Sequence, residues 1–472
     1  MSETRVGPYG DGRNQRSSAV PLPDELKVLR TILLDPLPPN ANGQAGPFRG
    51  SLRSKNLTAR NGEIGLLMPR AGGTGVDAVI LSPDGDELRR FPTVLRRTTR
   101  AEWSRAGTEG RDARAGQFVG LWLDDGRLAF RAGGDFPDFD CLDSVTGDAK
   151  EIGTLRATKG TYNQHSYIST ADGCQFVLLP PGGHKISGTY LSYTMGGPTM
   201  LVGGTCVDMN CWTPLVDEAG VVAIGHWTRP AKSNGCTVTS FKLIMGRLIK
   251  QWSNEIPGML ARRSYDGCCQ PIPWTMDAER IYLLIHPHDV KRDYPHFDLA
   301  AQSELRVISR ATGETEWSCV VPGLLTGDQL SCQLSLGEIG LSILAVPYSS
   351  AKDGRLVTID TVRKLVRSAS DLHGIHADDF AKAGCTQIYS AGNDTILCAA
   401  TALNPTVVRI AMPRFKPGEI VNHSWDVAVP ACDASGVQLD DFICLDGRAY
   451  VLCTYRNGSP TRNGGQLLLI LG

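Results

Sequence analysis

The chain has 472 residues and carries 48 Lys and Arg against 49 Asp and Glu, for a formal net charge of -1. Hydrophobic residues make up 42% and charged residues 21%, which is ordinary globular composition with ample material for a large core. No stretch approaches the roughly 18 apolar residues that a membrane span needs, and the charge balance draws the chain neither to nucleic acid nor to an anionic membrane. We therefore expect no membrane association and no nucleic-acid partner.

The N-terminal residues 1–20 are polar and contain no apolar run of the kind found in secretory signals. We predict that they form a disordered tail and that the protein is cytoplasmic. The chain has 14 cysteines, and several lie inside strand-like apolar runs, including Cys398, Cys444 and Cys453. Reduced, buried thiols are expected in this compartment, with a disulfide framework as the alternative for an exported chain.

Residues 21–58 are predicted to form a closing strand followed by a linker. The segment Leu26–Leu34 is apolar enough for an outer strand of a sheet, although a short helix fits the same pattern. Pro, Asn and Gly are frequent after it, which is typical of an extended connection.

Short apolar runs recur along the rest of the chain. Each is rich in β-formers and too short for an ordinary helix, so each indicates a buried strand. Successive runs begin 46 to 60 residues apart, a spacing that matches the blades of a β-propeller. We predict an all-β fold in which residues 59–472 form a single propeller of eight four-stranded antiparallel blades, with seven blades as the alternative. The runs begin at Gly65, Phe118, Gln175, Val221, Ile281, Leu341, Thr395 and Tyr450.

Tryptophans mark the last strand of several repeats. Trp252, Trp317 and Trp425 are each followed by a proline five residues later. A large aromatic on an outer strand can wedge between neighbouring blades, and proline suits the end of an edge strand. The turn and strand at Ala311–Trp317 (ATGETEW) resemble the repeat of quinoprotein-type propellers, in which Thr-Gly precedes a tryptophan. This resemblance covers about residues 60–472 and implies a fold rather than an activity.

The C-terminal run QLLLILG predicts that the last blade lacks its outer strand. The segment Leu26–Leu34 would supply it and close the ring, removing edges that would otherwise invite aggregation.

Two groups of residues could carry chemistry. Cys268 and Cys269 are adjacent, and in the quinoprotein alcohol dehydrogenases that the repeat resembles such a pair covers the quinone cofactor. The arginine that follows the pair in that family is replaced here by Gln270 and Pro271, and its calcium ligands cannot be matched. A separate loop holds His286, His288 and His296, and two histidines one residue apart can chelate a transition metal. A solvated loop without metal is the alternative.

We expect a non-enzymatic scaffold or interaction module that belongs to a larger assembly, binds proteins through its loops and faces, and holds no resident cofactor. Long loops between short strands, as at residues 286–302, suit a docking platform. Two other functions remain open: a quinoprotein-type or metal-dependent oxidoreductase, and a surface or virion-associated attachment propeller.

Overall fold

A computed structural model describes the strands of the chain and many of the turns between them. The described residues are 13, 15–34, 53–54, 57–69, 76–93, 117–122, 127–132, 138–143, 145–154, 167–171, 174–179, 189–195, 203–207, 209–211, 215–217, 219–227, 235–244, 247–260, 273–286, 302–325, 330–338, 340–347, 354–372, 387–392, 395–401, 407–416, 419–428, 434–457 and 465–472. Within these ranges there is no helix, so none that could cross a membrane.

The described strands form eight sheets of four or five strands each, which confirms the predicted all-β fold. We number the sheets in chain order. Sheet 1 contains β4 (Thr58–Arg60), β5 (Glu63–Pro69), β6 (Val76–Leu81) and β7 (Glu87–Thr93). Sheet 2 contains β3 (Arg53–Ser54), β8 (Gln117–Trp122), β9 (Arg127–Ala132), β10 (Asp138–Asp143) and β11 (Ala149–Thr154). Sheet 3 contains β12 (Tyr167–Ala171), β13 (Cys174–Leu179), β14 (Thr189–Met195) and β15 (Gly203–Val207). Sheet 4 contains β16 (Met209–Cys211), β17 (Leu215–Asp217), β18 (Gly220–Trp227), β19 (Gly235–Ile244) and β20 (Arg247–Pro257).

The remaining four sheets contain the following strands. Sheet 5 contains β21 (Met259–Leu260), β22 (Trp274–Met276), β23 (Arg280–His286), β24 (Gln302–Ser309) and β25 (Thr315–Leu325). Sheet 6 contains β26 (Leu330–Gly337), β27 (Gly340–Pro347), β28 (Gly354–Asp360) and β29 (Leu365–Leu372). Sheet 7 contains β1 (Ser17–Ser18), β30 (Gln387–Ala391), β31 (Thr395–Thr401), β32 (Val407–Lys416) and β33 (Glu419–Ala428). Sheet 8 contains β2 (Val28–Leu34), β34 (Ala434–Leu445), β35 (Arg448–Asn457) and β36 (Gly465–Leu471).

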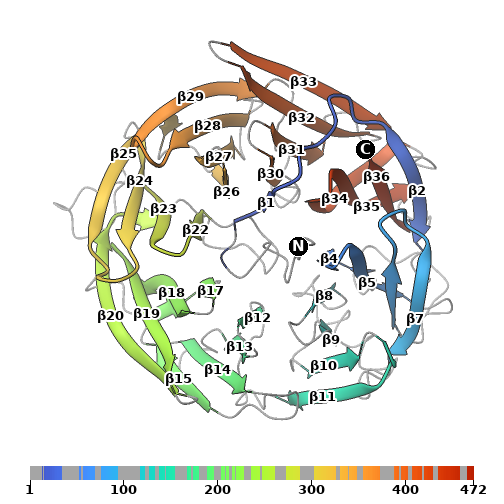
Figure 1. The fold of residues 1–472 in the computed structure, drawn as a ribbon, viewed down its shortest axis with the longest axis horizontal. Coiled ribbons are helices and arrows are strands. Elements are labelled where there is room, and N and C mark those ends of the chain that lie inside the picture. The colour runs from blue at the N-terminus through green and yellow to red at the C-terminus, as the bar shows by residue number, and fades with distance from the viewer. Residues whose placement is uncertain are drawn as a thin grey trace.

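The sheets follow one another around a common centre, with sheet 8 beside sheet 1 (Figure 1). The predicted apolar runs at Ile281 and Leu341 lie on β23 and β27, each the second strand of its sheet counted from the centre. In sheet 5 the side chains of Ile281, Leu283 and Ile285 are fully buried. Because both faces of such a strand pack against neighbouring sheets, its sequence is continuously apolar rather than alternating.

The predicted strand over Leu26–Leu34 is present as β2. It pairs antiparallel with β36, with Thr31 opposite Leu469 and Leu34 opposite Gln466, and so forms the outer strand of sheet 8. Lys27 and Gly472 exchange both of their backbone hydrogen bonds at the end of this ladder. Leu34 is buried in the core between sheets 8 and 1, whereas Leu33 on the opposite side is 58% exposed.

Outer strands pack on the hairpin turn of the next sheet, as the tryptophan pattern predicts. Trp252 of β20 lies against Gly313 in the turn between β24 and β25, and its Nε1 donates a hydrogen bond of 2.8 Å to the Arg310 carbonyl. Gly313 has a φ of +77°, and a Cβ there would lie 2.6 Å from the Trp252 ring. Glycine is therefore required both by the turn and by the ring that covers it. The side chain of Trp425 lies outside the described residues.

Sheet 8 is fastened to sheet 1 at the turn between β6 and β7. Arg30 donates to the Asp84 carbonyl and to the Asp86 carboxylate, and Arg448 pairs with the Asp84 carboxylate at 2.7 Å. The Tyr450 hydroxyl donates to the Pro83 carbonyl at 3.0 Å. Both the N-terminal strand β2 and the C-terminal strand β35 thus hold the same turn of sheet 1.

The N-terminal region contains two features that the sequence does not indicate. The carbonyl groups of residues 13, 15, 16 and 18 accept hydrogen bonds from the sheets, and Ser17–Ser18 forms β1. The predicted linker also contains a strand, β3, which runs parallel to β8. Both strands are two residues long and polar, so no apolar pattern announces them. Residues 1–12 lie outside the described residues.

Candidate functional site

A cluster of polar contacts lies where the N-terminal segment crosses the inner strands of sheets 4 to 7. We call the described residues 13 and 15–20 the arm. Figure 1 shows β1, the strand of the arm, near the centre of the ring beside β26 and β30. From there the chain runs outwards to β2, so the segment from residue 13 to residue 34 contacts sheets 4 to 8 in succession and then sheet 1 through Arg30.

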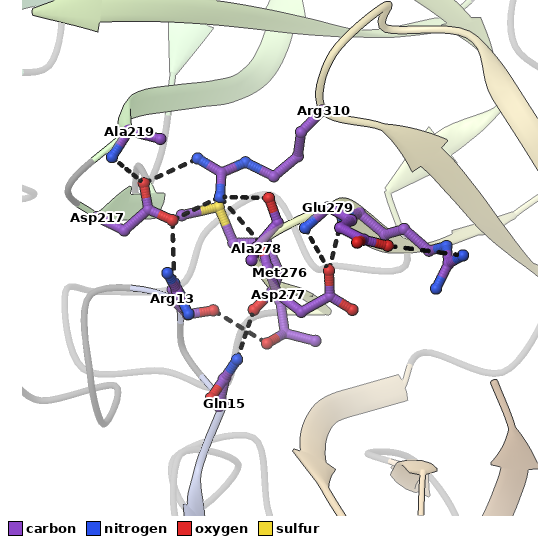
Figure 2. Close-up of polar contacts among 11 residues, drawn as sticks. Arg13, Gln15, Asp217, Ala219, Met276, Asp277, Ala278, Glu279 and Arg310 are labelled. Carbon is purple, nitrogen blue, oxygen red and sulfur yellow. Dashed lines mark hydrogen bonds and ion pairs between the residues drawn. The ribbon is translucent and has the colours of Figure 1, made fainter. Parts of the chain in front are cut away.

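Asp217, at the end of β17, lies between two guanidinium groups (Figure 2). Arg310 from sheet 5 donates through both of its terminal nitrogens, with Nη2 at 2.8 Å from Oδ1. Arg13 of the arm donates from Nε to Oδ2 at 3.0 Å. The carboxylate is only 4% exposed, compared with 23% for the Arg13 side chain and 10% for that of Arg310. Asp217 also accepts a hydrogen bond from the Ala219 amide at 2.9 Å.

These bonds fix the charge state of Asp217. Burial by itself opposes ionisation of the carboxyl group, but the hydrogen bonds and charge of Arg310, together with the charge of Arg13, outweigh it. The pKa of Asp217 therefore lies below its ordinary value, and the group is a carboxylate at neutral pH. A carboxylate held between two arginines is an acceptor and a charge partner, and it is not poised to act as a general acid or base near pH 7.

The backbone of the arm is bound by amide groups from three successive sheets. The Met276 amide donates to the Arg13 carbonyl at 3.1 Å, and the Leu336 amide donates to the Gln15 carbonyl at 2.7 Å. In sheet 7 the Ser390 and Gly392 amides donate to the carbonyls of Arg16 and Ser18, at 3.1 and 2.9 Å. The donors lie at the ends of β22, β26 and β30, at equivalent places in three repeats, and together they form a track of hydrogen-bond donors.

Side-chain bonds strengthen this track. Thr275 Oγ1 donates to the Arg13 carbonyl, and Gln15 Nε2 donates to the Met276 carbonyl, both at 3.0 Å. Ser335 Oγ donates to the Arg16 carbonyl at 2.7 Å and lies 2.7 Å from Ser390 Oγ. Ser335 and Ser390 belong to the inner strands of sheets 6 and 7, so two neighbouring sheets together hold one point of the arm.

His286, predicted as a metal ligand, is the last residue of β23 and is buried. Its Nδ1 lies 2.8 Å from Ser303 Oγ, and burial lowers its pKa to about 4. The imidazole is therefore neutral at physiological pH and packs inside sheet 5. Within the described part of the chain, no group of three His, Cys, Asp or Glu side chains could hold a metal ion. His288 and His296 lie outside the described residues, as do Cys268 and Cys269.

Five cysteines are described with their side chains, and all are free thiols. Burial raises the pKa of Cys236, Cys319 and Cys332 above the ordinary value of a thiol. They therefore behave as apolar core residues rather than as reactive thiolates. The other two are Cys444 and Cys453.

The sequence analysis identified none of the residues of this site. Asp217 and Arg310 are 93 residues apart, and the arm itself (RNQRSSAV) has neither hydrophobic periodicity nor a motif. The one signal in the sequence is that Arg310 directly precedes the turn at Ala311–Trp317, where a charged side chain could have been tested for an acidic partner in the preceding repeat.

No family model and no curated protein sequence matches the chain. Several solved structures are similar to the chain at low identity. Sqt1 of Saccharomyces cerevisiae is 11% identical, with 72% of this chain and 81% of that chain covered and a TM-score of 0.44. The β-propeller domain of the Trilobed protease from Pyrococcus furiosus is 9% identical, with 77% and 95% covered and a TM-score of 0.41.

The quinohemoprotein alcohol dehydrogenase of Comamonas testosteroni is also among these structures. It is 9% identical, covers 99% of this chain and 80% of its own, and has a TM-score of 0.41. Quinoprotein-type propellers are thus among the proteins that this chain resembles at the level of the fold, as the repeat pattern predicts. Similarity at this level says nothing about activity.

Proposed function

We propose that the protein is a non-enzymatic β-propeller, closed into one ring of eight blades, that binds extended segments of protein partners across the inner ends of its sheets. It acts as a component of a larger protein assembly in the cytoplasm. The observation that carries this proposal is the arm: an extended polypeptide lies across the inner strands, and amides from three sheets bind its backbone.

The chemistry of this region suits binding better than catalysis. Asp217 is already neutralised by Arg310, and His286 is a buried neutral side chain bonded to Ser303. Backbone amides on several strands recognise a polypeptide main chain irrespective of its sequence, while the Asp217 carboxylate selects a cationic side chain. The free, buried thiols fit a reducing compartment. No described residue favours either alternative function.

Photo-crosslinking in cells tests the proposal. A photoreactive amino acid replaces Glu279, whose side chain is 79% exposed in the turn after β22, beside the track. The matched control position is Arg363, equally exposed at 79% in an outer hairpin turn. We expect protein adducts from position 279 and few from position 363. Adducts from position 363 alone would show that partners bind at the outer hairpin turns instead of at the track. A lack of adducts at both positions would reject the proposed function.

A further inference from the structure

The contacts that hold the arm on the track are polar. Of the described arm residues, Ala19 and Val20 are apolar and both are exposed, so this segment is held by polar contacts rather than by burial of apolar side chains. Polar contacts of this kind can be exchanged for water or for another polypeptide at modest net cost, because both states satisfy the same groups.

Arg13 can also leave Asp217 at a small cost in free energy. When Arg13 leaves, Asp217 keeps the two-nitrogen pairing with Arg310 and its bond from the Ala219 amide. The buried carboxylate is therefore never left without a countercharge, which is the situation that makes breaking a buried ion pair costly. Arg13 is the more exposed of the two arginines and the only one of them that comes from the arm.

The arm conformation itself carries a small cost. Arg16 has a φ of +53°, in the left-handed region, where a residue with a Cβ is strained. The Ser390 amide and the Ser335 hydroxyl, which both donate to its carbonyl, hold it there. A segment with the same backbone path and a more suitable residue at this place would bind without that cost.

We propose that the arm is an exchangeable ligand of its own ring, and that the track accepts in trans an extended protein segment whose arginine takes the place of Arg13 on Asp217. This inference rests on the proposed function and names its partner class and its regulation. The tethered arm occupies the track until a partner segment with the same pattern, an arginine followed by an extended polar stretch, displaces it. Tethering gives the arm an effective concentration of about millimolar, so only an abundant or tightly bound partner competes.

The test uses the full chain. A protease recognition sequence is inserted between Asp24 and Glu25, which are exposed and lie between the arm and β2, and is cut after the protein has folded. A fluorescent synthetic peptide of residues 10–22 is then added, and its uptake is followed by fluorescence anisotropy. We expect the cut protein to take up the peptide at least about 100-fold more tightly than the uncut protein, whose arm stays tethered.

A second peptide, carrying Arg13→Ala, tests the anchor. It should bind the cut protein about tenfold more weakly, as expected for the loss of about one partly exposed ion pair. If the cut arm stays attached and no peptide enters, or if the arm leaves and no peptide binds, the arm is not an exchangeable ligand. Equal binding of the two peptides would overturn the role of arginine.

Hydrogen exchange of the uncut protein provides an independent measurement. The amides of Met276, Leu336, Ser390 and Gly392 should exchange faster than those of Tyr282 and Leu284 in the neighbouring core strand. Equal protection would mean that the arm opens only when the ring unfolds. If the peptide-binding and hydrogen-exchange experiments give negative results while position 279 still yields partner adducts, the proposed interaction module is retained. Only the proposal that the arm is an exchangeable ligand is then rejected.

Discussion

The two halves of the N-terminal segment are bound by different physical means. Residues 13 and 15–20 bind through carbonyl groups, the Arg13 guanidinium and the Gln15 side-chain amide, and their apolar side chains, Ala19 and Val20, are exposed. Residues 26–34 place Leu26 and Leu34 in the core between sheets 8 and 1, and β2 pairs with β36. Hydrophobic burial fixes the second half permanently, whereas the first half is held by groups that other polypeptides also possess. One stretch of chain thus combines a structural strand with a replaceable ligand.

The largest loss of stability is expected from substitution of Asp217, because it pairs both with Arg13 of the arm and with Arg310 of sheet 5. Asp217→Ala leaves the buried Arg310 guanidinium without its carboxylate and should destabilise the fold by about 3–5 kcal/mol in denaturant unfolding. The matched control is Asp371→Ala, which removes a 55% exposed partner of Arg355 and should cost less than about 1 kcal/mol. Equal effects of the two substitutions would mean that the Asp217 cluster behaves as an ordinary surface pair.

A smaller loss is expected from the second half. Leu34→Ala removes a side chain that is 2% exposed, and should lower the free energy of unfolding by about 2–3 kcal/mol through lost burial and the cavity left behind. Leu33→Ala, one residue earlier and 58% exposed, is the control and should change stability by less than about 1 kcal/mol. If Leu34→Ala leaves the free energy of unfolding unchanged, β2 does not contribute to the core through this side chain.

As the pH falls, the folded state should lose the stability contribution of His286 before it loses that of Asp217. The folded pKa of His286, about 4, lies below its value of about 6.5 in the unfolded chain, so its contribution is complete above pH 6.5 and is lost as the pH falls towards 4. At pH 5 the loss should be about 2 kcal/mol. The pKa of Asp217 is lowered, so its contribution persists until the pH falls below the ordinary range of a carboxyl group. His286→Gln should flatten the stability profile between pH 6.5 and 4, and an unchanged profile would assign the titration elsewhere.

The smallest effect is expected for Arg13→Ala. Asp217 retains Arg310, so the substitution should cost about 1 kcal/mol or less in unfolding experiments. The same substitution should nevertheless increase exchange at the Met276 amide, which donates to the backbone of residue 13. A loss of stability as large as that of Leu34→Ala would abolish the distinction between the two halves.

The parts of the fold that were predictable from the sequence are those in which apolar side chains carry the structure. The runs at Ile281 and Leu341 lie on buried strands and are apolar throughout, and Trp252 packs on a neighbouring turn as its position indicated. The innermost strands were not identified, because Leu215–Asp217 and Trp274–Met276 are too short for a pattern. Proline was also a weaker boundary than expected: β20 ends at Pro257, but Pro322 lies inside β25 beside a shift in register.

The candidate site escaped prediction for a related reason. The bonds to Arg13, Gln15 and Arg16 are made largely to their carbonyl groups, and every residue has a carbonyl group. The sequence of such a segment is free to vary, so it resembles a disordered tail. His286 was a candidate metal ligand because His288 follows it closely, and the structure adds that its side chain is buried, with Nδ1 at 2.8 Å from Ser303 Oγ.

The pairing of β2 with β36 also has a consequence for synthesis. The two strands are separated by about 430 residues, since β2 ends at Leu34 and β36 begins at Gly465. At roughly 5–20 residues per second, a ribosome needs roughly 20–90 s to produce the partner of β2. During that time the apolar side chains of β2, among them Ile32 and Leu34, have no sheet to join. The nascent chain must therefore be shielded from its neighbours on a polysome until the last strand emerges, and a chaperone that holds β2 would serve that need.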